Sequence, residues 1–356
     1  MLRAGAGAHD VVRILTVNAG STSEKVSLVL AGDEVVPYAS LDDAVAEARP
    51  DVVAHRVVHG GSRTAATVID DATRAELESL VGLAPLHQPP ALRMIDRCRD
   101  SWPDVPQVAC FDTAFHATIP TTARTYALPE RLRRLVRVYG FHGLSHRWAA
   151  AQVATVAPDA RRVLVAHLGG GASLCAVLDG ASVWTSMGFT PLDGLVMATR
   201  SGSLDPGAVL WLAGNTDEDL SVVLEKESGL LGLAGTSDMR ELLSRVEHGD
   251  TVAAEALDVY VHRLVTAAGS AVAAMGGLDV LAFTGGVGEN APAVRRAVAH
   301  RLDWLGVRTT GTGAAPTADR RVVDLTEAGA PVRTLVVAAR EDLQMAAEVR
   351  AVAESL

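Results

Sequence analysis

The sequence predicts an α/β protein made of two similar domains. Short runs of β-branched residues alternate with longer amphipathic stretches, which is typical of sheets covered by helices. A chain of 356 residues is longer than chains that fold around a single ordinary hydrophobic core, which indicates two domains. Residues 14–30 and 163–178 each read as an apolar strand, a turn of glycine and small hydroxyl residues, and a second apolar strand. Either segment alone fits an ordinary hairpin, but the two together indicate a duplicated fold with a ligand between its halves.

The expected strands are apolar runs bounded by turn residues, at 13–17, 25–30, 52–57, 107–111, 163–167, 173–178, 280–284 and 332–337. The expected helices are stretches with apolar residues at helical spacing, at 71–81, 90–99, 145–156, 217–227, 238–246, 251–275, 291–302 and 341–354. No proline- or serine-rich linker divides the chain into two blocks. The domain boundary is therefore expected inside packed α/β structure.

The chain is acidic, with 32 Lys and Arg residues against 42 Asp and Glu residues and a formal net charge of −10. This balance excludes a generally basic nucleic-acid-binding protein, so any anionic ligand needs a local cluster of donors. The longest uncharged stretch, residues 264–278, is shorter than the roughly 20 residues of a membrane span. The N-terminal residues lack the apolar segment of a signal peptide. We expect a cytoplasmic protein that contacts neither nucleic acid nor membrane.

Three glycine turns are candidates for phosphate binding. Residues 20–23, Gly-Ser-Thr-Ser, offer unhindered backbone N–H groups and hydroxyls between two strands, and residues 169–171 form a second such turn. The Walker A pattern is absent. Residues 284–290 follow an apolar run and precede a helical pattern, with Asn290 as the expected N-cap and Pro292 in the first turn. Many α/β proteins have such a turn, so it indicates a nucleotide site only together with the others.

Polar residues gather at strand ends and beside glycines in four further segments, which hold Arg56, Asp112, His142 and Arg200 among their members. One such residue alone is usually structural, whereas four segments together indicate a site. The histidines are not spaced as H-E-x-x-H, and Cys98, Cys110 and Cys175 are far apart, so neither a zinc site nor a disulfide framework is expected.

Taken in order, these motifs resemble the acetate kinase family of acetate and propionate kinases. The matching segments are VNAGSTSEK, HRVVHGG, PLHQPPAL, FDTAFHATIP, YGFHGLSH, AHLGGGASL, TSMGFTPLDGLVMATRSGSLDPG, KESGLLGLAGTSDMREL and FTGGVGEN. The resemblance implies two duplicated ribonuclease H-like α/β domains around a central cleft, the fold shared by acetate kinase, sugar kinases, Hsp70 and actin. The domains would be residues 1–116 and residues 117–339, the latter with the nucleotide site and dimer contact, while helix 340–356 returns to the first.

The resemblance also implies reversible transfer of the ATP γ-phosphoryl group to acetate, which gives acetyl phosphate and ADP. Arg56 and Arg200 match the arginines that flank the transferring group, and a guanidinium suits phosphate oxygens. His142 matches the histidine that stabilises the transition state, and Asp112 matches the active-site aspartate. Because acetate is already ionised at pH 7, we expect Asp112 to orient Arg56 or the metal shell rather than accept a proton.

The remaining positions carried over from the family are of four kinds. The Mg²⁺ (or Mn²⁺) positions are Asn18 and Glu341, whose oxygens suit a hard cation. The ATP/ADP positions are Lys25, His167, Leu168, Gly169, Gly170, Gly171, Asp238, Met239, Arg240, Gly286, Val287, Gly288, Glu289 and Asn290. The substrate positions are Arg56, Val58, Leu86, His87, Phe141 and Pro191. A homodimer is implied, with residues 228–234 and 270–278 as candidate contacts, in a cytoplasmic enzyme of acetyl-CoA biosynthesis.

The chain departs from the family pattern at several places. Gly170 stands where the family has Asn, Ser203 where it has Asp, and Gln88 where it has Asn. Residues 338–340, Ala-Ala-Arg, replace Pro-Thr-Asn before Glu341, and residues 31–50 are far fewer than usual, which we interpret as trimming away from the cleft. Two alternatives stay open: another short-chain acyl kinase such as a propionate kinase, and an inactive nucleotide-binding interaction protein of the same fold.

Overall fold

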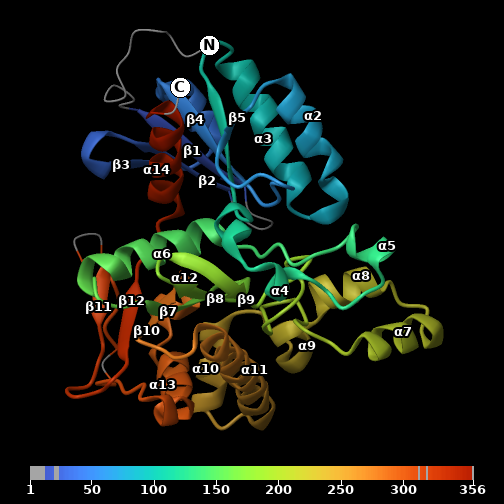
Figure 1. Cartoon of the computed structure of the whole chain (residues 1–356), viewed down its shortest axis with the longest axis vertical. Helices are drawn as coiled ribbons and strands as arrows, with labels where there is room; N and C mark the ends of the chain where they lie inside the picture. The colour runs from blue at the N-terminus through green and yellow to red at the C-terminus, as the bar shows by residue number, and fades with distance from the viewer. Residues whose placement is uncertain (1–12, 20–23, 312, 318–319, 355–356) are drawn as a thin grey trace. The chain divides into compact units, whose positions relative to one another are not determined.

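The computed structural model describes residues 13–19, 24–311, 313–317 and 320–354, and the chain divides into two compact units (Figure 1). Unit 1 comprises Met1–Ala117, Phe141–Trp148 and Arg340–Leu356, and unit 2 comprises Thr118–Gly140 and Ala149–Ala339. Residues 141–148, which the sequence analysis assigns to the second domain, thus cluster with unit 1. The predicted phosphate turn at residues 20–23 lies outside the described residues.

Unit 1 is built on a six-stranded mixed sheet in the order β3-β2-β1-β4-β6-β5. Its strands are β1 (Ile14–Ala19), β2 (Glu24–Val29), β3 (Val35–Tyr38), β4 (Val52–Val57), β5 (Thr67–Val68) and β6 (Gln107–Phe111). The central strands β1, β4 and β6 run parallel, and the outer pairings are antiparallel. The carboxyl ends of the three central strands therefore lie at one edge of the sheet.

Helices cover this sheet and decide which side chains are buried. They are α1 (Leu41–Glu47), α2 (Asp71–Ser79), α3 (Gln88–Ser101) and α14 (Glu341–Glu354), with short 3₁₀ turns η1 (Ala31–Asp33), η2 (Val81–Leu83) and η3 (Ala114–Thr118). Leu15, Val17 and Val57 pack in two apolar clusters with residues of α1, α2 and α3. Because side chains alternate along a strand, Asn18 and Arg56 point to the opposite face, on which α14 packs.

Unit 2 repeats the sheet of unit 1 strand for strand. Its strands are β7 (Arg162–Leu168), β8 (Ala172–Leu178), β9 (Ala181–Thr185), β10 (Val280–Thr284), β11 (Val322–Asp324) and β12 (Arg333–Val337), in the order β11-β12-β10-β7-β8-β9. β7, β10 and β12 run parallel and the outer pairings are antiparallel, as in unit 1. The two hairpins noted in the sequence are β1–β2 and β7–β8, and the predicted duplication is confirmed.

The helices of unit 2 include the longest of the described part, α11 (Thr251–Met275), which packs on β7, β8 and β9. The others are α4 (Thr121–Arg124), α5 (Glu130–Arg133), α7 (Pro206–Asn215), α8 (Leu220–Val222), the π-helical η4 (Val223–Glu227), α9 (Gly229–Ala234), α10 (Met239–Glu247), α12 (Gly285–Asn290), α13 (Pro292–Arg301) and the 3₁₀ turn η5 (Asp303–Leu305). α6 (Gly143–Val156) begins in unit 1 and ends in unit 2. None of the described helices has the length and apolar character needed to cross a bilayer.

Two predicted features around the glycine turn at 285–290 need correction. The turn is a short helix, α12, and Asn290 ends it instead of capping the next helix. Ala291 is the N-cap residue of α13 and provides no side-chain cap, while Pro292 occupies the first turn as predicted. The Asn290 side-chain amide donates back to the Gly286 carbonyl at 2.9 Å, so this residue satisfies a carbonyl of α12 rather than N–H groups of α13.

Candidate active site

A polar cluster lies at the carboxyl edge of the unit 1 sheet. Asn18 is near the end of β1, Arg56 is near the end of β4, and Asp112 directly follows β6. Glu341 is the first residue of α14, which packs on β1 and β4. Lys25 pairs with Asn18 across the β1–β2 ladder, so both side chains lie on the same face. The parallel strands β1, β4 and β6, the antiparallel partner β2 and the helix α14 thus bring five predicted site residues from distant parts of the sequence to one edge.

Arg56 and Asp112 form a close ion pair. Arg56 Nη2 donates to Asp112 Oδ2 at 2.7 Å, and Arg56 Nε lies 3.2 Å from both carboxylate oxygens. The Asp112 side chain is 1% exposed and that of Arg56 is 15% exposed. Burial lowers the pKa of Arg56, but the carboxylates of Asp112 and Glu341 raise it above its ordinary value. The guanidinium is therefore held in a fixed direction by a buried carboxylate.

Asp112 itself is held by backbone groups as well. Burial raises the pKa of its carboxyl group, and the Arg56 charge opposes that rise. The carboxylate accepts a hydrogen bond from the backbone N–H of His142, and the Asp112 carbonyl accepts one from Gly143 N at 2.9 Å. A Cβ atom on Gly143 would lie 2.1 Å from that carbonyl oxygen, so only glycine fits here. His142 has φ = 56°, in the left-handed region that few non-glycine residues adopt.

Asn18 and Glu341 lie together beside Arg56. Asn18 Nδ2 donates to Glu341 Oε2 at 2.7 Å, and Asn18 Oδ1 accepts from Arg56 Nη1 at 3.1 Å. Arg56 Nη1 is 3.5 Å from Glu341 Oε2. The amide nitrogen of Asn18 thus faces Glu341, and its oxygen faces Arg56. An amide oxygen and a carboxylate are both hard ligands, of the kind bound by a cation that keeps most of its water. These residue types can bind Mg²⁺, and the assignment of Asn18 and Glu341 to a metal stays a prediction.

The predicted substrate residues of unit 1 are largely buried. Val58 is 4% exposed and Phe141 is 1% exposed, while Leu86 and His87 are partly exposed.

Two buried polar side chains hold the surrounding backbone in place. Gln88 accepts from His59 N at 3.3 Å and donates to His59 O at 3.1 Å, which joins the start of α3 to the chain just after β4. The histidine ring of His116 contacts the Phe141 carbonyl at 2.9 Å, and burial lowers its pKa to about 4, so it is neutral at physiological pH.

Unit 2 has a matching arrangement at the carboxyl edge of its own sheet. Residues 169–171 connect β7 to β8, and α12 directly follows β10. Gly285 has φ = 78°, and a Cβ atom there would lie 2.7 Å from the Leu168 carbonyl oxygen. Glu289 Oε1 accepts from Ala339 N, which follows β12, at 3.0 Å. His167, at the end of β7, is partly exposed and pairs with Thr284 across the β7–β10 ladder.

Arg200 lies on a loop that many contacts hold in place. Its Nη1 donates to the Pro191 carbonyl at 2.7 Å. The backbone of Gly229 packs so closely that a Cβ atom there would lie 2.8 Å from the Arg200 carbonyl oxygen. Ala198 N donates to Gly170 O at 3.1 Å, so the loop is joined directly to the turn at 169–171. Two predicted parts of the site, the glycine turn and the loop of Arg200, therefore meet within unit 2.

Comparison with known proteins identifies the family. A model of the acetokinase family matches residues 40–347. The acetate kinase of Clavibacter michiganensis subsp. michiganensis is 42% identical over 350 residues, which cover 92% of this chain and 86% of that protein. The chain belongs to the acetokinase family. The acetate kinase of Pseudarthrobacter chlorophenolicus is 44% identical over 326 residues, which cover 89% of this chain and 84% of that protein.

Solved structures of this acetate kinase family share the fold. A propionate kinase from Francisella tularensis has a TM-score of 0.86 and 33% identity, covering 95% of this chain and 98% of that one. Porphyromonas gingivalis acetate kinase has a TM-score of 0.83 and 30% identity, covering 96% of this chain and 99% of that one. The predicted family and the predicted duplicated α/β fold are confirmed. As a member of the acetate kinase family the chain is a phosphotransferase, as predicted.

Two departures from the acetate kinase pattern have a local structural account. Ser203 Oγ donates to Asp193 Oδ1 at 2.6 Å and accepts from Gly194 N at 3.1 Å, so it closes the loop that carries Arg200. Sequence reasoning missed Asp193, although its position between Pro191 and Gly194 in the loop motif marked it for attention. Arg340 Nη2 forms an ion pair with Asp342 Oδ2 at 2.9 Å, so the carboxylate of the residue next to Glu341 is already engaged.

Gly170, the third departure, occupies open space. A Cβ atom built there meets no atom within 4 Å, and its φ lies outside the positive range. We therefore predict that Gly170→Asn folds normally and keeps its melting temperature within about 2 °C, because no contact is lost or strained. If this turn contacts nucleotide, the added amide should change KM for ATP and leave KM for acetate unchanged. A large fall in melting temperature would contradict the open environment.

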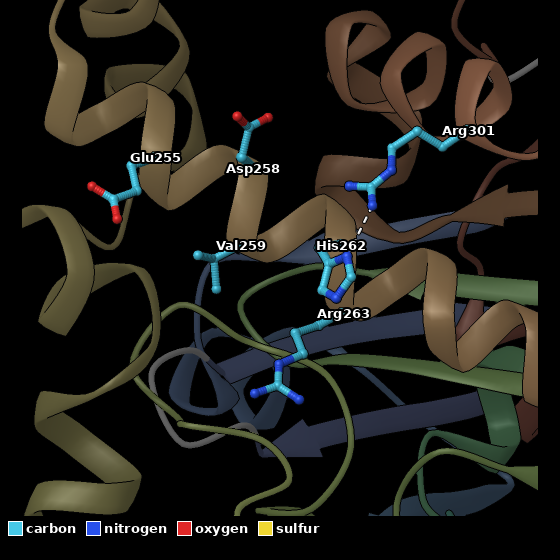
Figure 2. A pocket seen from close by; sticks show the side chains of 6 residues that line it. All are labelled: Glu255, Asp258, Val259, His262, Arg263 and Arg301. Carbon is cyan, nitrogen blue, oxygen red and sulfur yellow. Dashed lines mark hydrogen bonds between the residues drawn. The ribbon is translucent and has the colours of Figure 1, made fainter.

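The last group of predicted nucleotide residues starts α10. The Asp238 side chain caps this helix by accepting from Arg240 N at 2.8 Å, and it also pairs with the Arg240 guanidinium. Met239 is 5% exposed, so its side chain belongs to the core. A separate surface hollow of about 640 Å³ lies along α11 and the end of α13. It is lined by the six residues drawn in Figure 2, which are Glu255, Asp258, Val259, His262, Arg263 and Arg301. None of these residues is among the predicted site residues.

Proposed function

We propose that this chain catalyses reversible transfer of the γ-phosphoryl group of ATP to acetate, which gives acetyl phosphate and ADP. The observation that carries the proposal is the cluster of Arg56, Asp112, Asn18 and Glu341 at one sheet edge. These residue types at these family positions suit phosphoryl transfer, which depends mostly on positioning and on stabilising charge. Membership in the acetate kinase family supports the same reaction.

The two parts of the chain would bind mostly different ligands of the reaction. The first domain, residues 1–116 with helix 340–356, would hold the metal, and residues 117–339 would hold most of the nucleotide, while acetate would contact residues of both. Val58, Leu86, Phe141 and Pro191 would contact the acetate methyl group and His87 would lie beside them. Lys25 and residues 167–171, 238–240 and 286–290 would contact ATP or ADP.

In the proposed reaction each charged residue stabilises an anion. Arg56 and Arg200 would bind oxygens of the transferring phosphoryl group, and His142 would donate a hydrogen bond to it in the transition state. Acetate needs no general base because it is ionised at neutral pH. Asp112 would therefore act by orienting Arg56, with which it forms the buried ion pair. Asn18 and Glu341 would hold Mg²⁺ or Mn²⁺, which supplies charge neutralisation between the phosphates.

The deciding experiment is a hydroxamate assay for acetyl phosphate formed from ATP and acetate by the purified chain. Formation that needs both substrates supports the proposal, and its absence would overturn it. A second candidate is a propionate kinase, because the structure of the propionate kinase from Francisella tularensis is as similar as those of acetate kinases. Relative kcat/KM on acetate, propionate and butyrate decides between them, since one methylene changes binding by about 1–3 kcal/mol.

We also propose that the enzyme, in its cytoplasmic setting of acetyl-CoA biosynthesis, is a homodimer that uses α7. This helix has no charged residue and no buried residue, and Leu210 and Trp211 are 75% and 64% exposed. Of the two segments suggested by sequence, residues 270–278 place Ala271, Val272 and Met275 in the core. Exposed Leu and Trp on an uncharged helix suit a second copy of the same surface.

Charged substitutions on the exposed surface of α7 are expected to change the mass of the protein in solution. Leu210→Glu with Trp211→Glu should convert a dimer of the 37.1 kDa chain to a monomer in light scattering, because burying two carboxylates in the contact is unfavourable. Trp304→Glu is the matched control, since Trp304 is 73% exposed in η5 and should leave the dimer intact. A monomeric wild-type chain at micromolar concentration would contradict the dimer itself.

A further inference from the structure

Arg295, in α13, is a charged residue in the interior of unit 2. It is 2% exposed and has the largest volume among the fully buried side chains of the described residues. Arginine is almost never fully buried unless it is paired. Burial lowers the pKa of Arg295, neighbouring Arg296 lowers it further, and no carboxylate among the described residues contributes an opposing shift. Within the described part of the chain, the groups that hold this cation in the interior are therefore neutral acceptors.

The acceptors of Arg295 are backbone carbonyls. Its Nη1 donates to Gly288 O at 2.9 Å and to Glu289 O at 2.7 Å, and its Nη2 donates to Ala314 O at 3.1 Å. Gly288 and Glu289 belong to the last turn of α12, whose carbonyls have no partner within a helix that ends at Asn290. A cation at this end of a helix is favourable, and only a guanidinium reaches in several directions at once.

The contacts of α12 show what this arrangement fixes. At its start Gly285 packs against the Leu168 carbonyl, and near its end Glu289 accepts from Ala339 N. Arg295 adds a third attachment from the interior and extends it to Ala314, in the segment before β11. The short helix is thus held from three sides, and the interior attachment is the one that depends on a buried charge.

We propose that Arg295 is a positioning residue for the nucleotide site, which sets the backbone of residues 286–290 for contact with ATP or ADP. This inference rests on the proposed function, in which those residues contact nucleotide. Arg295 would not touch the ligand, since its guanidinium is engaged with the three carbonyls on the interior side of α12. Its effect would appear in nucleotide affinity, and not in the handling of acetate.

The test compares Arg295→Lys and Arg295→Met with Arg296→Lys, an exposed neighbour that serves as the matched control. Lys keeps the charge but cannot reach three carbonyls, and Met keeps much of the volume without any donor. We expect Kd for ADP, measured by calorimetry without turnover, to rise about tenfold in Arg295→Lys and further in Arg295→Met. KM for ATP should rise in parallel, while KM for acetate and the control variant should stay within about twofold.

The outcomes separate this inference from the proposed function. A wild-type chain that fails to bind ADP would overturn both. A wild-type chain that binds ADP, together with an Arg295→Lys variant of lower melting temperature and unchanged Kd, would show that Arg295 only stabilises the fold. If the variants do not fold, hydrogen exchange on the wild-type chain decides: ADP should protect amides of 286–295 and 313–316 together, and protection of neither segment would overturn the proposal.

Discussion

Replacing Arg56 or Arg200 by alanine is expected to lower kcat by about three orders of magnitude or more. Each guanidinium is held before substrate arrives, Arg56 by Asp112 and Arg200 by the Pro191 carbonyl. A donor fixed in advance stabilises developing charge without any cost of reorganisation at the moment of reaction. The measurement is kcat in the hydroxamate assay on purified variants whose circular dichroism matches that of the wild type. Near-normal kcat in either variant would contradict its assignment.

Controls for this prediction come from the same chain. Arg13→Ala removes an exposed pair with Asp51 in unit 1, and Arg161→Ala removes an exposed pair with Asp179 in unit 2. Both should keep kcat within about twofold because exposed ion pairs contribute little. Arg56→Ala also leaves the buried Asp112 carboxylate without its partner. The double variant Arg56→Ala with Asp112→Asn removes that charge, so a kcat that stays low in it traces the loss to the missing guanidinium.

Removal of divalent cations with EDTA should abolish activity, and Mg²⁺ or Mn²⁺ should restore it. In the proposed site, ATP and acetate would bring roughly five negative charges, and Arg56, Arg200 and Lys25 would supply about three positive ones. The carboxylates of Asp112 and Glu341 would add to the imbalance without a metal. Activity that persists in excess EDTA would contradict a metal requirement.

Glu341→Ala should raise the Mg²⁺ concentration for half-maximal rate more than it raises KM for acetate. The reason is that Glu341, whose Oε2 accepts from Asn18 Nδ2, is the charged member of the proposed metal pair, and the variant loses that charge. Asp342→Asn is the matched control, because Asp342 is engaged with Arg340 through two hydrogen-bonded nitrogens of that side chain. An unchanged metal requirement in Glu341→Ala, with a raised one in Asp342→Asn, would move the assignment to Asp342.

The central strands and the unit 1 cluster could be predicted from sequence because their signals are local. β4 and β6 each contain a short apolar run, and Arg56 near the end of β4 and Asp112 just after β6 stand out as charged residues. Strands β3, β5, β9 and β11 were missed because they are short or lack a long apolar run, so pairing with a neighbour decides their existence.

Other features depend on tertiary contacts that leave no mark on the sequence. The helix α7 was missed because Pro and Gly open a segment whose apolar residues lack an amphipathic period. The conformation of α12 depends on Gly285, which packs against Leu168, a residue far away in the sequence. It also depends on Arg295, whose buried side chain donates to carbonyls of α12. The roles of Gln88 and Ser203 likewise follow only from their hydrogen-bond partners, His59 and Asp193, which the sequence alone does not identify.

The position of α14 in unit 1 has a consequence for how the protein is made. This helix packs on β1, β2, β4 and β6, yet residues 149–339 of unit 2 are synthesised before it. Because the ribosome synthesises the chain from its N-terminus, one face of the first sheet stays uncovered until residues 341–354 have been made. Glu341 arrives with the same helix. A chain that stops before α14 would therefore lack both the cover of its first sheet and the carboxylate beside Arg56, so under the proposed function it would not be competent for phosphoryl transfer.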